Sequence, residues 1–403
     1  MNVLIVNAGS SSLKYQLFDT VSKNVLAKGG CERIGLDGGR VEHKVPGKEP
    51  YELVANMPTH EDAIRNVISL LIDKDHGCIA SMDEIGAVGH RVVHGGPYFS
   101  GSVLADADVL DKVEKCRDLA PLHIGPSLVG IHACMDVMQN VPQVLVFDTA
   151  FHSTMPKEAY LYPIPYEFYE KYHIRRYGFH GSSHKYVSRE MIRLLGRGAE
   201  NTKIVTCHLG NGSSIAAVKD GKVIDTTMGF TPLDGLIMGT RSGSIDPAIV
   251  TFLMEKENLT AAEVNSLLNK KSGLLGVSGK HSDFRDCRLA MENEGDERAK
   301  AAIDILAYQV KKYIGSYAAA MGGLDAIVFT AGIGENNNII RALPCRGLEY
   351  MGVEFDDKAN DAIGRPATVT CISKPSSRVK VYLIPTNEEL IIAEETEAIV
   401  LGR

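Results

Sequence analysis

Long apolar runs and clusters of basic residues are both missing from this sequence. No stretch approaches eighteen uninterrupted apolar residues, and the N-terminus has neither a basic segment nor a long apolar one, so we expect no membrane span and no export signal. Lys and Arg number 43 against 50 Asp and Glu, which gives a net charge of −7 without a basic block or tail. That balance argues against nucleic acids and anionic membrane surfaces as main partners.

Closely spaced cysteines are also lacking. The eight cysteines lie far apart and form no C-x-x-C pair. In a chain of this size, such spacing is typical of scattered thiols in a reducing compartment, and it indicates neither a disulfide framework nor a zinc site. We therefore expect a cytoplasmic protein.

The commonest nucleotide and metal fingerprints are absent. Residues 276–280 (GVSGK) are similar to the end of a Walker A loop, but the spacing fails and His281 stands where Ser or Thr is required. The G-x-G at 332–334 is followed by Asn337 where a third glycine would complete the dinucleotide fingerprint. His180 and His184 are four residues apart without the adjacent glutamate of a zinc helix, so we expect no transition-metal site.

The first eighteen residues, in contrast, carry a clear pattern of strand, turn and strand. Residues 3–6 are an apolar run that predicts a buried strand, residues 7–12 are a Gly/Ser turn, and residues 13–18 alternate as a returning strand. Small residues in such a turn let backbone N–H groups approach a ligand, and hydroxyls and a positive charge add to them. The hydroxyls and the charge are those of Ser10, Ser11, Ser12 and Lys14. The stretch is a plausible anion cradle.

The same device recurs along the chain. Residues 204–218 again give strand, Gly/Asn/Ser turn and strand, and residues 326–337 run from a strand into a Gly-rich turn. Internal repetition suggests two related halves, each presenting one hairpin loop to a shared cleft. Strands that alternate with helices predict an α/β protein with a mainly parallel sheet, and 403 residues suffice for two or three domains.

Four charged residues stand out locally. Arg91 lies between a predicted buried strand and a Gly pair, and Arg241 lies between two glycines at 239 and 243. Asp148 follows the apolar strand 144–147, where open α/β sheets place ligands. Glu388 begins the last predicted helix, where the helix dipole alone could explain it. We also expect a loop at 121–126, bracketed by prolines.

Eight stretches in this order identify a family resemblance: VNAGSSSLKY, GHRVVHGG, VFDTAFH, RRYGFHGSSH, CHLGNGSS, GFTPLDGLIMGTRSG, FTAGIGEN and IPTNEE. Over essentially its full length the sequence resembles the acetate kinases. The resemblance implies an α/β fold of two duplicated ribonuclease H-like (actin-like ATPase) domains with a nucleotide cleft between them. The domains would be residues 1–150 plus 388–403, for acyl and phosphate groups, and 151–387, for the nucleotide. A homodimer is expected for the family.

The implied reaction is reversible phosphoryl transfer from ATP to acetate, giving ADP and acetyl phosphate, with Mg²⁺ or Mn²⁺. The catalytic residues would be Arg91, Asp148, His180 and Arg241. The nucleotide and phosphate residues would be Ser10, Ser12, Lys14, His208, Leu209, Gly210, Asn211, Gly212, Asp283, Phe284, Arg285, Gly332, Ile333, Gly334, Glu335 and Asn336. The substrate would meet Arg91, Val93, Leu122, His123, Phe179 and Pro232, and Asn7 and Glu388 would serve the metal.

Physical chemistry limits the role of Asp148. Carboxyl groups titrate near pH 4, so acetate at neutral pH has no proton to lose, and we interpret Asp148 as a metal or water ligand rather than a general base. Two departures from the family pattern are Ile124-Gly125 after Leu122-His123, beside the acyl pocket, and His281, on the purine side. A propionate kinase and an actin-like nucleotide switch remain alternatives.

Overall fold

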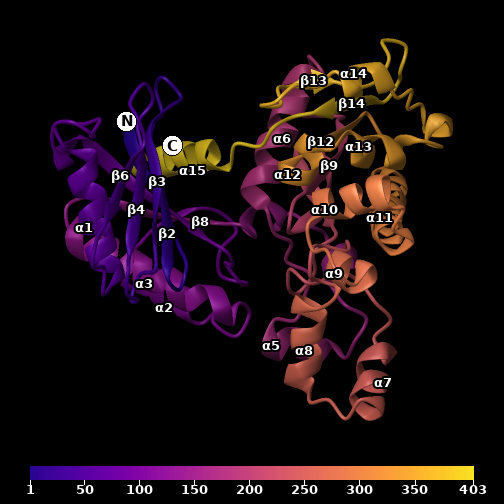
Figure 1. Cartoon of the computed structure of the whole chain (residues 1–403), viewed down its shortest axis with the longest axis horizontal. Helices are drawn as coiled ribbons and strands as arrows, with labels where there is room; N and C mark the ends of the chain where they lie inside the picture. The colour runs from indigo at the N-terminus through magenta and orange to yellow at the C-terminus, as the bar shows by residue number, and fades with distance from the viewer. The chain divides into compact units, whose positions relative to one another are not determined.

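The computed structural model describes all residues 1–403, and the chain divides into two compact units. Unit 1 comprises residues 1–151 and 387–403, and unit 2 comprises residues 152–386 (Figure 1). No helix anywhere in the chain is both long and apolar enough to cross a membrane. All eight cysteines are free thiols.

Unit 1 is built on one mixed sheet of eight strands. In spatial order these are β5 (Tyr51–Val54), β4 (Arg40–Lys44), β3 (Asn24–Glu32), β2 (Ser12–Asp19), β1 (Asn2–Ala8), β6 (Ile85–Val92), β8 (Gln143–Phe147) and β7 (Val103–Leu104). Strands β1 and β2 form an antiparallel hairpin, whereas β1, β6 and β8 run parallel. The side chains of Val3 to Val6 are all buried, because both faces of the sheet are covered at β1.

Helices cover the two faces of this sheet. The helices of unit 1 are α1 (His60–Leu71), α2 (Ala107–Glu114), α3 (Pro121–Val137) and α15 (Glu388–Val400). Val88 of β6 belongs to the apolar cluster formed with α1 and α3, whereas its neighbour Gly89 faces Thr396 of α15. Successive residues of a strand point to opposite faces, so α15 covers the face away from α1 and α3. Figure 1 shows this yellow helix against the indigo sheet.

Unit 2 repeats the order of the central strands. Its six-stranded sheet runs β11 (Lys222–Thr226), β10 (Ser213–Lys219), β9 (Lys203–Leu209), β12 (Ala326–Thr330), β14 (Lys380–Leu383) and β13 (Thr370–Cys371). Strands β9 and β10 form the antiparallel hairpin, and β9, β12 and β14 run parallel. In both sheets, therefore, the first strand of the unit lies between its antiparallel hairpin partner and a parallel strand, in the orders β3-β2-β1-β6-β8 and β11-β10-β9-β12-β14.

Helix α11 (Glu297–Met321) lies over one face of the second sheet and α6 (Gly181–Leu194) over the other. Val205, Cys207 and Leu209 of β9 join the apolar cluster with α11, while the alternate residues Thr206 and His208 bond to side chains of α6. The other helices of unit 2 are α4 (Lys157–Tyr160), α5 (Tyr166–Tyr172), α7 (Ala248–Lys256), α8 (Ala261–Lys270), α9 (Gly273–Ser278), α10 (Phe284–Leu289), α12 (Ala331–Asn336), α13 (Asn338–Cys345) and α14 (Asp357–Asp361).

The structure confirms the α/β class and the duplicated architecture, and it corrects two local predictions. Residues 121–126 are not a loop: α3 starts at Pro121, where a proline without N–H is tolerated, and continues through Pro126. Because Pro126 has no N–H, it cannot bond the Leu122 carbonyl as a helical residue would. The third Gly-rich turn is the six-residue helix α12.

Because His90 is buried, we expect the free energy of unfolding to fall in acid. Its Nε2 lies 2.8 Å from Gln143 Oε1, and burial lowers its pKa to about 4. Its unfolded pKa is about 6.5. The unfolded chain therefore binds more protons between those two values, and stability falls as the pH drops below about 6.5. From pH 7 to 5 we expect a loss of about 2 kcal/mol.

Urea unfolding of the wild type and of a His90→Asn variant at both pH values measures this contribution. The variant keeps an amide that can donate to Gln143 but has no group that titrates in this range. Its unfolding midpoint should fall less between pH 7 and pH 5 than that of the wild type. Equal falls in the two proteins would contradict the assignment to His90.

Candidate functional site

The hairpin turn of unit 1 is held firmly at the carboxyl edge of the sheet. Gly9 N–H donates to the Ser12 carbonyl at 2.8 Å, and the Gly9 carbonyl lies 2.8 Å from His60 Nε2 at the start of α1. Gly130 of α3 packs against the turn, since a Cβ added there would lie 2.4 Å from Ala8 Cβ. Ser10 and Lys14 are exposed. The backbone of the turn is thus fixed while its polar side chains face outward.

Arg91 and Asp148 form a bidentate ion pair beside this turn. Arg91 Nε donates to Asp148 Oδ1 at 3.1 Å and Nη2 donates to Oδ2 at 2.6 Å. Burial raises the pKa of Asp148, which is 2% exposed, and the guanidinium of Arg91 opposes that shift. A guanidinium has five N–H groups, and this pair uses two of them, so Nη1 can still bind a second carboxylate.

Glu388 stands near the pair as the first residue of α15. Burial raises its pKa to about 7, the charge of Arg91 lowers it and the charge of Asp148 raises it further. The carboxyl group of Glu388 therefore binds a proton more readily than an exposed glutamate does. A cation bound nearby would favour its ionised form.

A cavity of about 230 Å³ opens between the hairpin turn, Arg91 and the start of α3. Its lining includes Asn7, Ser12, Lys14, Arg91, Val93, Leu122 and His123. Ile124, the first departure from the family pattern, is fully buried in the core beneath α3 and does not line the cavity. Gly125, the other residue of this departure, does not line the cavity either. The predicted pocket residues Phe179 and Pro232 belong to unit 2, so a pocket made by all of them stays a prediction.

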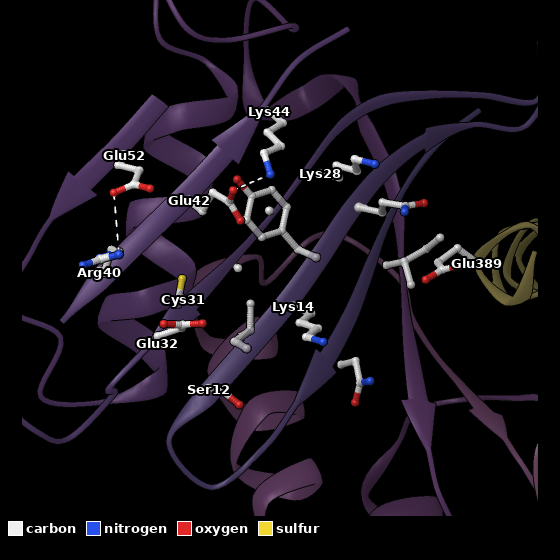
Figure 2. A pocket seen from close by; sticks show the side chains of 17 residues that line it. Ser12, Lys14, Lys28, Cys31, Glu32, Arg40, Glu42, Lys44, Glu52 and Glu389 are labelled. Carbon is white, nitrogen blue, oxygen red and sulfur yellow. Dashed lines mark ion pairs between the residues drawn. The ribbon is translucent and has the colours of Figure 1, made fainter. Parts of the chain in front are cut away.

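A larger hollow of about 620 Å³ lies over the strands β1 to β4 and shares Asn7, Ser12 and Lys14 with the smaller cavity (Figure 2). Among the other charged side chains that line this hollow, four form two ion pairs. Arg40 lies 3.8 Å from Glu52, and Lys44 is ion-paired with Glu42. Lys14 therefore stands where the two hollows meet, and it is the basic residue they have in common.

The hairpin of unit 2 also ends in a tight turn, and it meets two other predicted nucleotide segments. Gly210 N–H donates to the Gly212 carbonyl at 3.1 Å. A Cβ added to Gly210 would lie 3.8 Å from Ala331 Cβ, at the start of α12. A Cβ added to Gly239 would lie 2.8 Å from the Ser282 carbonyl and 3.4 Å from Asn211 Oδ1. The hairpin thus borders both α12 and the segment before α10.

His180 and Arg241 converge on Gly212. A Cβ added to Gly212 would lie 3.3 Å from His180 Nε2 and 3.7 Å from Arg241 Nη1. His180 caps α6 in the left-handed backbone conformation, at φ 58°, which is uncommon for a residue with a side chain. Arg241 Nη1 donates to the Pro232 carbonyl at 3.3 Å, and burial lowers its pKa. An imidazole nitrogen and a guanidinium nitrogen therefore face one glycine of the turn.

Comparison with known proteins shows the family of this chain. A model of the acetokinase family matches residues 2–394. The chain belongs to this family. It is 58% identical over 402 residues to the acetate kinase of Caldanaerobacter subterraneus subsp. tengcongensis, with all of both chains covered.

Two solved structures of the family have the same fold. The acetate kinase of Porphyromonas gingivalis is 49% identical, with a TM-score of 0.95 over 99% of each chain. A propionate kinase from Francisella tularensis is 42% identical, with a TM-score of 0.89 over 99% of each chain. These likenesses confirm the resemblance read from the eight sequence stretches.

Several residues that the family pattern marks for the nucleotide have structural partners in unit 2. Phe284 and Leu209 are buried in the apolar core, so only their backbone could contact a ligand. Glu335 Oε1 accepts from Ala331 N–H at 2.9 Å and from Thr386 N–H at 3.0 Å, which ties α12 to the chain after β14. Asn336 Nδ2 donates to the Gly332 carbonyl at 2.9 Å.

The remaining members of that set lie at accessible points. Asp283 caps α10, with Oδ1 accepting from Arg285 N–H at 2.7 Å, and both side chains are exposed. A Cβ added to Gly332 would meet nothing within 4 Å. His281, the second departure from the family pattern, forms a turn with Ser278 before α10. Space for a ligand thus exists along the edge formed by the hairpin, α10 and α12.

The oxygen donors of unit 1 fit a hard divalent cation. Asn7, Asp148 and Glu388 would offer an amide oxygen and two carboxylates, the ligand type that Mg²⁺ prefers. No group of three or more His, Cys, Asp and Glu side chains is arranged to hold a metal ion.

Sequence reasoning missed the buried polar residues behind the site. Ser214, Thr206 and Ser183 are fully buried and bond to the ring nitrogens of His180, His184 and His208. The contact of His60 with the first hairpin turn was likewise not indicated by the sequence. The alternation of polar residues along 206–214 could have indicated a buried polar face, but it does not reveal which partner each residue would contact.

Arg241 gives a direct test of the unit 2 site. Replacing it with Leu removes a positively charged donor that faces Gly212, and we expect kcat to fall by roughly 10² to 10³, the scale for one lost transition-state donor. Arg193→Leu is a matched control, because that arginine pairs with Glu190 on the exposed side of α6 and should be silent. Steady-state kinetics measure both, and a near-normal kcat in Arg241→Leu would remove this residue from the chemistry.

Proposed function

We propose that this chain catalyses the reversible transfer of the γ-phosphoryl group of ATP to acetate, giving acetyl phosphate and ADP. The observation that carries the proposal is the small cavity of unit 1, where Arg91 is held by Asp148 next to the phosphate-type turn of β1 and β2. A fixed guanidinium in a cavity with apolar members is suited to a small carboxylate with a short alkyl group.

Arg91 would bind the substrate carboxylate through the N–H groups that Asp148 does not use. The Asp148 pair fixes the plane of the guanidinium, so the bound oxygen is oriented before transfer begins. Acetate is ionised at neutral pH, so no general base is required for it to act as the nucleophile. Val93, Leu122 and His123 would surround the remaining part of the acid, with Phe179 and Pro232 as further members of the pocket.

His180 and Arg241 would stabilise the transferring phosphoryl group. Phosphoryl transfer depends mainly on positioning and on neutralising charge on three equatorial oxygens, and these two donors already face one glycine of the turn. Gly210, Asn211 and Gly212 would approach the phosphates through their backbone, as would Ser10, Ser12 and Lys14 of the first turn. His208, Asp283, Arg285, Gly332 and the backbone of Ile333 and Gly334 would hold the nucleoside.

Mg²⁺ would neutralise charge on the phosphates of ATP when bound. We propose that Asn7 and Glu388 contact the ion or its waters, and that Asp148 acts as a metal or water ligand while it holds Arg91. Mn²⁺ has the same preference for oxygen ligands and could replace it. The raised pKa of Glu388 suits this role, because a bound cation shifts the group to its charged form.

Propionate is the second candidate substrate. One solved relative at 42% identity is named a propionate kinase, and one methylene in an apolar pocket changes binding by only about 1–3 kcal/mol. We propose acetate because relatives named acetate kinases reach 58% identity over the whole chain. ATP and ADP are the other partners.

We also propose a cytoplasmic homodimer. All eight cysteines are free thiols, as a reducing compartment would keep them. Helix α7 of unit 2 buries none of its side chains, and its Phe252 is 57% exposed. Helix α7 packs against α8 but leaves apolar side chains such as Phe252 exposed, and such a surface is suited to a second copy. Sedimentation at micromolar concentration tests this, and a monomer would remove the proposal.

The first experiment traps acyl phosphate with hydroxylamine in the presence of ATP, Mg²⁺ and acetate, propionate or butyrate in parallel. We expect rapid formation of hydroxamate, fastest with acetate. A preference for propionate would keep the chemistry and reassign the substrate. Hydrolysis of ATP without hydroxamate from any acid would overturn the kinase and favour a nucleotide switch.

A second experiment tests the role of Asp148. Asp148→Asn removes the charge that pairs with Arg91, and we expect a large loss of kcat that excess Mg²⁺ partly restores, since a weakened ligand raises the Mg²⁺ requirement. Asp225→Asn is a control, because Asp225 of β11 in unit 2 is a partly buried aspartate that also lies near an arginine, Arg176, and has no proposed role in the reaction. An Asp148→Asn variant that does not respond to Mg²⁺ would count against a metal role.

A further inference from the structure

A chain of buried hydrogen bonds leads from the predicted catalytic His180 into the core of unit 2. His180 Nδ1 lies 2.8 Å from Ser214 Oγ, and Ser214 Oγ lies 2.8 Å from His184 Nε2. His184 Nδ1 lies 2.7 Å from Thr206 Oγ1. Ser214, His184 and Thr206 have no exposed surface, so water cannot replace any of these links.

The single hydroxyl proton of Ser214 makes the two histidines interdependent. Ser214 contacts a ring nitrogen of each, and a hydroxyl can donate to only one of them while it accepts from the other. If His180 Nδ1 carries no proton, His184 Nε2 must carry one, and the reverse also holds. His184 is neutral, because burial lowers its pKa well below the usual 6.5, so it has one N–H to place.

Thr206 decides between the two arrangements. In one, Thr206 donates to His184 Nδ1 at 2.7 Å, His184 Nε2–H donates to Ser214, and Ser214 donates to His180 Nδ1. In the other, every bond is reversed and the Thr206 hydroxyl must donate to the Ala216 carbonyl at 3.5 Å, the weak limit of a hydrogen bond. The first arrangement keeps each bond short, so it is the more stable one.

We propose that Ser214 and His184 are positioning residues that hold His180 as the tautomer with its proton on Nε2. This nitrogen is the one that lies 3.3 Å from the position of a Cβ on Gly212, where Arg241 also points. A neutral His180 would then present an N–H donor to the phosphoryl oxygens, without needing to be charged. The tautomer is a property of the free protein, whereas its catalytic consequence rests on the proposed function.

A parallel but separate chain provides the control. His208 stacks on His180 with ring centroids 4.0 Å apart, and its Nδ1 lies 2.8 Å from Ser183 Oγ, which Thr386 Oγ1 reaches at 2.8 Å. Ser183 is as buried as Ser214 and lies on the same face of the sheet, but it bonds to the other ring. Ser183→Ala and Ser214→Ala therefore remove the same atom from similar surroundings.

The decisive measurement is the ¹⁵N spectrum of ring-labelled histidine in the full chain without substrates, which separates protonated from bare ring nitrogens. We expect His180, assigned by the signal lost in His180→Asn, and His184 both to carry the proton on Nε2. Ser214→Ala should leave His180 as a mixture of tautomers, and Ser183→Ala should leave it unchanged. A proton on Nδ1 of either ring in the wild type would overturn the proposal, and no variant is needed to see it.

Kinetics separate positioning from a structural role. In Ser214→Ala we expect kcat to fall about tenfold, the scale of one hydrogen bond, with the KM values for ATP and acetate little changed. A mixed tautomer with a normal kcat would show that the chain does not serve catalysis and would overturn that part. If the wild type forms no hydroxamate, the proposed function is wrong. The tautomer of His180 is still tested, because it is measured without substrates.

Discussion

The site depends on how one strand in each sheet is paired. β1 and β9 are each antiparallel to the next strand in sequence and parallel to the strand on the other side. The tight turn that follows such a strand must lie at the edge where the parallel strands end. In unit 1 this brings the turn at residues 9–11 beside Arg91 and Asp148, and in unit 2 it brings the turn at 210–212 beside the start of α12. The candidate phosphate contacts of the two hairpin turns follow from this pairing.

The alternation of side chains along β9 and β10 determines what lies behind the second turn. One face supplies the apolar cluster under α11, and the other faces α6 with hydroxyl and imidazole groups. Buried polar groups cost free energy unless each has a partner, and here the short links among Thr206, His184 and Ser214 provide the partners. A fully satisfied network of this kind also fixes orientation, which an apolar core would leave undefined at His180.

Much of this could be predicted from the sequence, for physical reasons that also explain the failures. The two hairpins were visible because apolar strands flanking a Gly-rich turn have a strong local signal, and the order of the eight stretches indicated the family. The helix through Pro126 was missed because a proline usually marks a boundary, whereas here α3 begins only five residues earlier. The Glu335 link to Thr386 could not be predicted, because it joins residues 51 positions apart in the sequence and depends on packing.

The position of α15 also bears on how the protein is synthesised. This helix covers the face of β6 at Gly89, where a Cβ would lie 2.5 Å from Thr396 Oγ1, yet it consists of residues 388–400. Unit 1 is thus the first unit to emerge from the ribosome and the last to be completed, with all of unit 2 translated in between. At a translation rate of roughly 5 to 20 residues per second, the face of β6 stays uncovered for on the order of 10 to 50 s before α15 is synthesised. A premature stop codon just before residue 388 would leave an intact second unit joined to a first unit with an open apolar face.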